Sequence, residues 1–293
     1  MSDSVTTQDQ SQTAGSIRTL RVGHTPDPDD AFMFYGFQQE AVTIPGYRVV
    51  HVLKDIQELN ELARTGELEV TAVSAAAYPT ITDQYYIMNV GASVGRGYGP
   101  VIVSPEPQSV ERIQGRRLAV PGLETTAYLL ARLYLPEFEP VVVRFDQVMD
   151  AVRTGQADYA LVIHDGQLTF GDSGFHKVVD LGEAWDRDTG LPIPLGLDLV
   201  RRDLGRDTAE QICAAMKASI EYALANPEGA DAYARDFGRH LDMPTSAKFV
   251  RMYVNEDTLN LGDEGRRALE TLLGRAAERG FAKAPGHLDI IGA

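Results

Sequence analysis

The chain has 293 residues, of which 44% are hydrophobic and 24% charged, and its formal net charge at pH 7 is −15. This size and composition are typical of a soluble globular protein with one or two domains. The acidic balance argues against a nucleic-acid partner, because phosphate binding requires clustered Lys and Arg. It does not exclude a small anion held by backbone N–H groups at a helix start. No run of 18 apolar residues is present, so no membrane span is predicted.

The two features that bear on cellular context are the N-terminal segment and the cysteine content. Residues 1–16 are polar and rich in Ser, Thr and Gln, without the basic and apolar regions of a secretory leader. We therefore predict a disordered tail and a cytoplasmic protein. The single cysteine, Cys213, excludes an intrachain disulfide and is predicted to be a buried structural thiol.

Strand-like and helix-like segments alternate from the start of the ordered chain. After a strand at residues 19–24, Asp27 is predicted to cap a helix that begins at Pro28, with Asp29 and Asp30 in its first turn. The acids alternatively indicate a metal site, but without a His or Cys cluster they do not specify one. We expect no metal, and we expect Asp27 or Asp30 to contact a ligand hydroxyl. A strand at 47–53, a helix at 55–64 and a strand at 70–74 follow.

An internal similarity relates two parts of the chain. Residues 55–74 and 146–164 each combine an acidic cap, a short amphipathic helix, Arg-Thr-Gly and an apolar strand. The repeat is too short and irregular for a solenoid. It predicts two similar α/β lobes, with Ser74 and His164 at equivalent strand ends that face each other across a cleft.

The segments that connect the lobes are predicted from Gly- and Pro-bearing stretches at 91–100 and 191–196. They divide the chain into a discontinuous first lobe, 17–103 plus 197–293, and a second lobe, 104–196. Helices predicted at 208–224, 227–238, 245–253 and 263–279 would pack back on the first lobe. The predicted fold class is thus α/β, with two lobes, two crossovers and a ligand cleft between the lobes.

The segment ALVIHDGQ, residues 160–167, carries the strongest chemical signal. A buried strand ends there in His164, and open α/β sheets bind ligands at the carboxyl ends of their strands. Histidine exchanges protons near neutral pH, so His164 is a candidate general base. The alternative is a histidine that only satisfies a buried backbone group. Asp165 either orients the imidazole or caps the next turn, and His24 is a second candidate base.

Two further segments are candidate ligand contacts. The stretch PGLETTA at 121–127 places a glycine turn and two hydroxyls before a helix, which is an anion-binding geometry. It implicates Thr125, Thr126 and Ala127, although an ordinary threonine N-cap gives the same pattern. The small side chains between Ser74 and Tyr78 either expose backbone N–H groups to a ligand or serve tight packing.

These segments resemble a known family over about residues 19–282: the menaquinone-biosynthesis proteins of the futalosine pathway. The resemblance rests on the order of TPDPDDAFMFYGF, AVSAAAYP, GYGPVIVS, PGLETTAYLL and LVIHDGQLTF along the chain. It implies a type II periplasmic-binding-protein fold. From its closer branch, the 1,4-dihydroxy-6-naphthoate synthases, it implies a lyase that acts on cyclic de-hypoxanthine futalosine. In that case His164 is the base, Thr126 and Ala127 bind the substrate carboxylate, and Ser74 is a further contact.

Two other functions stay open from the sequence. The related chorismate dehydratases act on a different substrate, and the same fold serves solute-binding proteins for small organic anions. The absence of a secretory leader favours an enzyme. Some family members have Ser-Pro-x-Pro-Asn-Asp where this chain has acids at Asp27 and Asp29, which leaves the ligand contacts of that loop open. Nothing in the sequence indicates a cofactor, and it does not reveal the oligomeric state.

Overall fold

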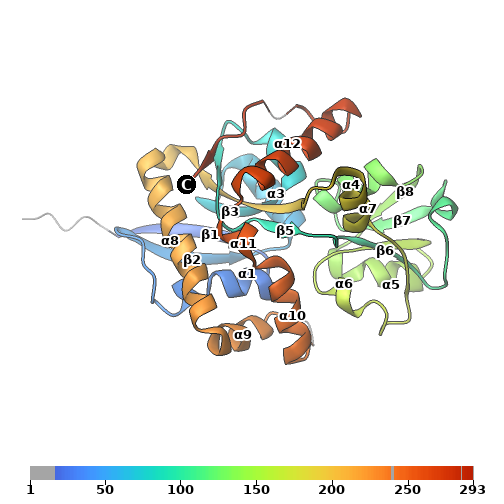
Figure 1. Cartoon of the computed structure of the whole chain (residues 1–293), viewed down its shortest axis with the longest axis horizontal. Helices are drawn as coiled ribbons and strands as arrows, with labels where there is room; N and C mark the ends of the chain where they lie inside the picture. The colour runs from blue at the N-terminus through green and yellow to red at the C-terminus, as the bar shows by residue number, and fades with distance from the viewer. Residues whose placement is uncertain (1–16, 239–240, 285, 293) are drawn as a thin grey trace, which may run out of the picture.

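The computed structural model describes residues 17–238, 241–284 and 286–292, so the tail predicted for residues 1–16 lies outside the described residues. Two β-sheets, each covered by helices, lie side by side (Figure 1). The α/β class predicted from the alternating segments is confirmed.

The first sheet contains seven strands in the order β12–β4–β11–β3–β1–β2, with β5 paired to β11. β1 runs parallel to β2 and β3, whereas β11 runs antiparallel to β3 and β4. The strand bounds are β1 Arg18–His24, β2 Tyr47–Leu53, β3 Val70–Ser74, β4 Tyr85–Met88, β5 Ser93–Gly95, β11 Ile193–Arg201 and β12 Ile290–Ile291.

The second sheet contains five strands in the order β10–β6–β9–β7–β8. β7 runs parallel to β8 and β9, and β6 runs antiparallel to β9 and β10. The bounds are β6 Val101–Ser104, β7 Arg117–Val120, β8 Glu139–Val142, β9 Tyr159–Val162 and β10 His176–Asp180. The chain therefore changes sheets twice, ahead of β6 and ahead of β11.

The lobe limits predicted at 103/104 and 196/197 both fall inside strands, β6 and β11. The changes of sheet lie just before each strand begins. β11 starts four residues earlier than predicted, because the strand accommodates Pro194 at an irregularity in its pairing with β5. Proline is tolerated at such irregular positions, where no ladder hydrogen bond is required of it. How the helices divide between lobes stays a prediction.

The helices follow the predicted local signals closely. In α3 the Asp55 side chain accepts hydrogen bonds from the N–H groups of Gln57 and Glu58, and Gly66 ends the helix at φ 67°. The helix predicted after Asp27 is divided in two at Phe34. The bounds are α1 Pro28–Met33, α2 Tyr35–Gln38, α3 Ile56–Thr65, α4 Thr126–Tyr134, α5 Val148–Arg153, α6 Gly166–Thr169, α7 Leu181–Thr189, α8 Arg206–Ala225, α9 Pro227–Arg235, α10 Met243–Tyr253, α11 Glu256–Leu259 and α12 Gly262–Glu278.

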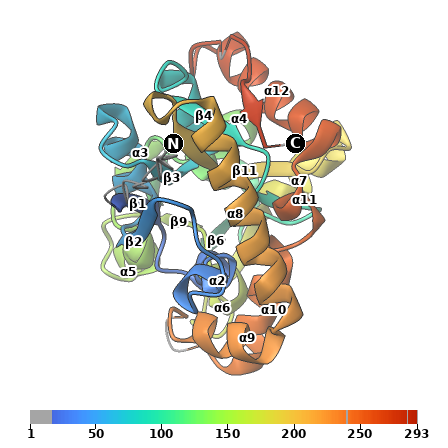
Figure 2. The same ribbon diagram turned by 90° about the vertical axis from the view of Figure 1, so that its left-hand side faces the viewer.

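Of the C-terminal helices, α8 and α12 contact β11 of the first sheet. Figure 2 shows α8 lying across this sheet, with α9 and α10 beyond its end. Cys213 on α8 is 1% exposed, which confirms a buried thiol, and burial raises its pKa to about 12. Within the described ranges, no helix has the combined length and apolar character needed to cross a bilayer.

Candidate active site

A cavity of about 100 Å³ lies where the two sheets approach each other. Its wall includes Ala72 and Ser74 from β3, Asp198 from β11, and His164 and Gln167 from the segment after β9. The prediction that Ser74 and His164 face the same cleft is confirmed.

His164 lies in the cavity wall in a left-handed backbone conformation, with φ 55°. Its side chain is 17% exposed, and the ring of Phe145 meets it edge to face at a centroid distance of 5.0 Å. His164 Nδ1 lies 2.8 Å from Asp27 Oδ2. A carboxylate in this position fixes the orientation of an imidazole and stabilises its protonated form.

Asp27 occupies the N-cap position of α1, as predicted, but its side chain makes no capping hydrogen bond. Its carboxylate reaches the His164 ring instead. Asp27 is thus a partner of this ring that the sequence analysis did not predict. Asp165 lies at the N-cap position of α6 without a side-chain capping hydrogen bond, and its role in orienting the ring stays a prediction. The helix-start interpretation of the acidic run is confirmed, and the described residues contain no group of three His, Cys, Asp or Glu placed to hold a metal ion.

The start of α4 forms the second part of the site. Thr125 caps this helix, since its Oγ1 accepts from Tyr128 N at 3.1 Å and donates to Gly122 O at 2.9 Å. The Thr126 hydroxyl donates to Leu195 O at 2.7 Å and accepts from Ala76 N at 3.2 Å, and so it links α4 to β11 and to the turn that follows β3. Both hydroxyls are thus engaged, and the backbone N–H groups at the helix start are the groups suited to an anion. Carboxylate binding at Thr125, Thr126 and Ala127 stays a prediction.

Ser74 is fixed by a residue that sequence reasoning missed. Ser74 N donates to Asn60 Oδ1 at 2.8 Å, and Asn60 Nδ2 donates to Ser74 Oγ at 3.1 Å. Asn60 is fully buried on α3. The sequence feature that could have identified Asn60 is its position beside Leu59, as a polar residue on the apolar face of an amphipathic helix.

Three buried carboxyl groups line the cavity: Asp29, Asp30 and Asp198. Asp30 Oδ2 accepts from Thr25 N at 2.6 Å and Thr25 Oγ1 at 2.7 Å, while burial raises the Asp30 pKa to about 6. Burial and the neighbouring acids also raise the pKa of Asp29 and of Asp198. None of the described residues that line the cavity is Lys or Arg. Ligand contact by Asp30 stays a prediction, with one of its oxygens already held by Thr25.

His24, the second candidate base, was predicted wrongly. Its ring stacks on Phe34 at 4.4 Å, and its Nε2 lies 2.9 Å from Nδ1 of His51. It is 2% exposed, and burial together with His51 lowers its pKa to about 3. The His24 imidazole is therefore neutral, and its role is to pack in the interior of the protein.

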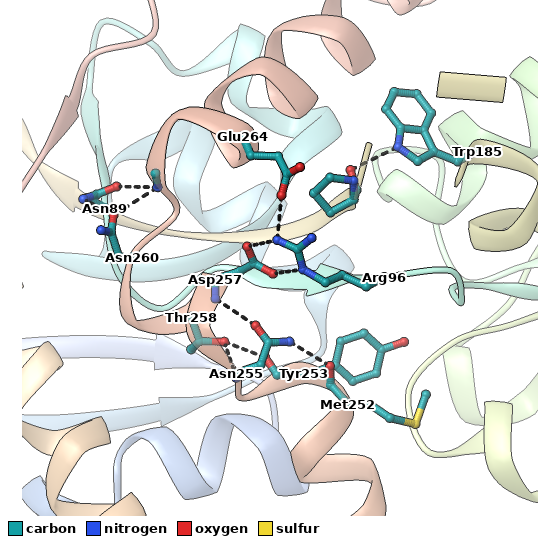
Figure 3. A network of polar contacts seen from close by, with 12 residues as sticks. Asn89, Arg96, Trp185, Met252, Tyr253, Asn255, Asp257, Thr258, Asn260 and Glu264 are labelled. Atoms are coloured by element: carbon teal, nitrogen blue, oxygen red, sulfur yellow. Dashed lines mark hydrogen bonds and ion pairs between the residues drawn. The ribbon is translucent and has the colours of Figure 1, made fainter. Parts of the chain in front are cut away.

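The first crossover is held by a polar network (Figure 3). Arg96, between β5 and β6, donates to both carboxylate oxygens of Asp257 at 2.8 and 2.7 Å and to Glu264 at 2.8 Å. Two charge-assisted hydrogen bonds to one carboxylate fix direction as well as distance. The Tyr98 hydroxyl contacts the Met252 carbonyl nearby. The crossover is thereby anchored to the helices that follow the first sheet.

Gln167 connects this crossover to the candidate base. In the amide orientation that satisfies its neighbours, Gln167 Nε2 donates to Gly99 O at 2.6 Å. Its Oε1 then accepts from His164 N at 3.2 Å and from the Tyr253 hydroxyl at 3.0 Å. Backbone strain of the kind seen at His164 persists only where the surroundings enforce it. Gln167 is therefore placed to hold the His164 conformation.

Replacing Gln167 with glutamate should lower kcat by about tenfold to a hundredfold with little change in KM, because a small displacement of a reacting group has an effect of this size. A carboxylate keeps the shape of the amide but cannot donate to Gly99 O. Steady-state kinetics would measure the effect, with the exposed Gln156→Glu as the matched control. Wild-type kcat in Q167E would contradict the positioning role.

Two α/β units joined by two crossovers around a central cavity define the class of this chain as a protein with the periplasmic-binding-protein fold. The fold is shared with an alkanesulfonate-binding protein from Xanthomonas axonopodis pv. citri bound to MOPS, at a TM-score of 0.66 and 13% identity over 93% of this chain and 96% of that one. A family model described as menaquinone biosynthesis matches residues 20–278. The chain belongs to this menaquinone-biosynthesis family.

Individual relatives agree with this assignment. Proteins named 1,4-dihydroxy-6-naphtoate synthase from Thermus thermophilus and Streptomyces coelicolor are 40% and 37% identical to the chain. The matches cover 91% and 92% of this chain and 97% of each relative. A crystal structure of a protein from Archaeoglobus fulgidus is similar at a TM-score of 0.85 and 44% identity, over 89% of this chain and 98% of that one. The family resemblance drawn from the sequence motifs is confirmed.

Proposed function

We propose that the protein is a 1,4-dihydroxy-6-naphthoate synthase, a carbon–carbon lyase that converts cyclic de-hypoxanthine futalosine to 1,4-dihydroxy-6-naphthoate. The observation that carries the proposal is the pairing of His164 with Asp27 in the wall of a cavity that also contains the start of α4. The names of the Thermus and Streptomyces relatives support the same reaction. A cytoplasmic location stays a prediction.

In the proposed mechanism the substrate carboxylate binds the backbone N–H groups at Thr126 and Ala127, with Ser74 beside it. This leaves an acidic C–H bond of the substrate near His164. The imidazole accepts the proton, and the electron pair of the C–H bond forms a carbon–carbon double bond as the adjacent carbon–carbon bond breaks. The fragment that leaves takes the electron pair of the broken bond and a proton from the imidazolium. The Asp27 carboxylate stabilises the imidazolium that forms. Closure of the two lobes excludes water from the cavity.

Product analysis decides between the proposal and its alternatives. We expect purified protein incubated with cyclic de-hypoxanthine futalosine to release 1,4-dihydroxy-6-naphthoate, detected by mass spectrometry. Parallel incubation with chorismate should give no product. Dehydration of chorismate alone would identify a chorismate dehydratase, and binding of either compound without turnover would identify a solute-binding protein.

A further inference from the structure

Asp198 is a buried carboxyl group in the cavity that the proposed mechanism does not use. It is 2% exposed on β11, opposite Ala72 of β3. Its Oδ2 is buried without a hydrogen-bond partner among the described residues, and the same holds for Asp29 Oδ1. A buried polar atom without a partner costs free energy unless a ligand or water satisfies it. These two oxygens mark a part of the cavity in which hydrogen-bonding capacity is unused.

The backbone at Gly91 leaves space for this carboxyl group. A Cβ atom at Gly91 would lie 2.1 Å from Asp198 Oδ2 and 2.8 Å from its Cγ. Gly91 also has φ 86°, a conformation that residues with a side chain rarely adopt. Gly91 and Asp198 line the cavity together. The Asp198 carboxyl thus has a defined position beside the cavity.

The charges around the Asp198 carboxyl group decide which chemical groups of a ligand can bind beside it. Burial, Asp30 and Asp29 raise the pKa of Asp198, and none of the described lining residues is Lys or Arg. A neutral carboxyl group offers one O–H donor and one carbonyl acceptor, which is the pattern that pairs with an alcohol. A ligand carboxylate is disfavoured next to three acids and is better accommodated at α4.

We propose that Asp198 and Asp29 form a subsite of the cavity that hydrogen-bonds hydroxyl groups of the substrate. The inference rests on the proposed function, because it assigns the uncharged, hydroxyl-bearing portion of that substrate. The cavity then recognises a molecule that carries both a carboxylate and alcohols. Asp198 selects such a molecule over acids of similar size that lack the alcohols.

Two substitutions at Asp198 test the subsite with cyclic de-hypoxanthine futalosine as substrate. Asp198→Leu keeps the branching at Cγ but removes every polar group, and it should raise KM by about tenfold or more. Asp198→Asn retains a donor and an acceptor, and it should restore KM to within about threefold of the wild-type value. The exposed Asp207→Leu is the matched control. An unchanged KM in D198L, or a D198N variant as impaired as D198L, would overturn the proposal.

A second measurement needs no substrate. The titratable groups that face Asp198 are Asp29, Asp30 and Cys213. Because the folded-state pKa of Asp198 is raised, the stability that its protonated form contributes is complete below the unfolded-state pKa and is lost as pH rises through the folded-state pKa. The melting temperature of the wild type should therefore fall relative to that of D198N between pH 4 and pH 8. If the melting temperatures of the wild type and D198N changed with pH in parallel, Asp198 would not be protonated in the folded protein, and the subsite proposal would be overturned.

Failure of the proposed function is distinguishable from failure of the subsite. If the wild type releases no product, the reaction assignment fails. Calorimetric binding of the same compound to wild type, D198L and D198N then tests the subsite alone. Weaker binding by D198L with recovery in D198N supports it, and equal binding by all three proteins overturns it.

Discussion

Replacement of His164 with asparagine is expected to lower kcat by about 10²- to 10⁴-fold, the range that removal of a general base produces. Asparagine is the informative choice because it tolerates the left-handed conformation of this position, φ 55°, better than most residues. The variant should therefore retain the wild-type melting temperature. Release of 1,4-dihydroxy-6-naphthoate, followed under saturating substrate, measures the effect.

A matched control and a rescue experiment separate base catalysis from a structural role. The exposed His287→Asn should retain wild-type kcat. His164→Gly adopts the same backbone conformation freely and removes the ring, so added imidazole should recover part of the lost activity. Near-normal turnover in H164N would refute the base assignment.

Replacement of Asp27 with asparagine should lower kcat by about 10²- to 10⁴-fold while KM changes by less than about threefold. Asp27 Oδ2 lies 2.8 Å from His164 Nδ1, and the Asp27 side chain is 1% exposed. The amide keeps the shape of the carboxylate but removes the charge that stabilises the imidazolium. Steady-state kinetics at several pH values would measure both parameters.

The pH profile shows whether Asp27 acts through His164. Loss of the neighbouring negative charge makes imidazole protonation less favourable, so the acidic limb of kcat/KM should move to lower pH in D27N. The exposed Asp172→Asn should leave the profile in place. A fall in kcat with an unmoved acidic limb would indicate that Asp27 only supports the fold.

Much of the fold could be predicted from local sequence patterns. The capped helix that begins after Asp55 and ends at Gly66, the helix start at Pro28 and the apolar strand before His164 are all present as predicted. Caps, prolines and apolar periodicity act within a few residues, so the sequence displays them directly. The repeated helix–strand unit also predicted that Ser74 and His164 face one cavity. The starts of β6 and β11 were harder to predict from the sequence, because strand pairing rather than composition decides where the chain changes sheets.

The sequence by itself determined the α/β class, the family and the histidine that follows β9. Only the tertiary structure decided that Asp27 meets this histidine, that Asn60 holds Ser74, that His24 is buried against Phe34, and that Asp198 lines the cavity. Each of these contacts joins segments far apart in the chain. Such contacts depend on how the sheets and helices pack in three dimensions, and no pattern of neighbouring residues specifies which distant side chain will meet which.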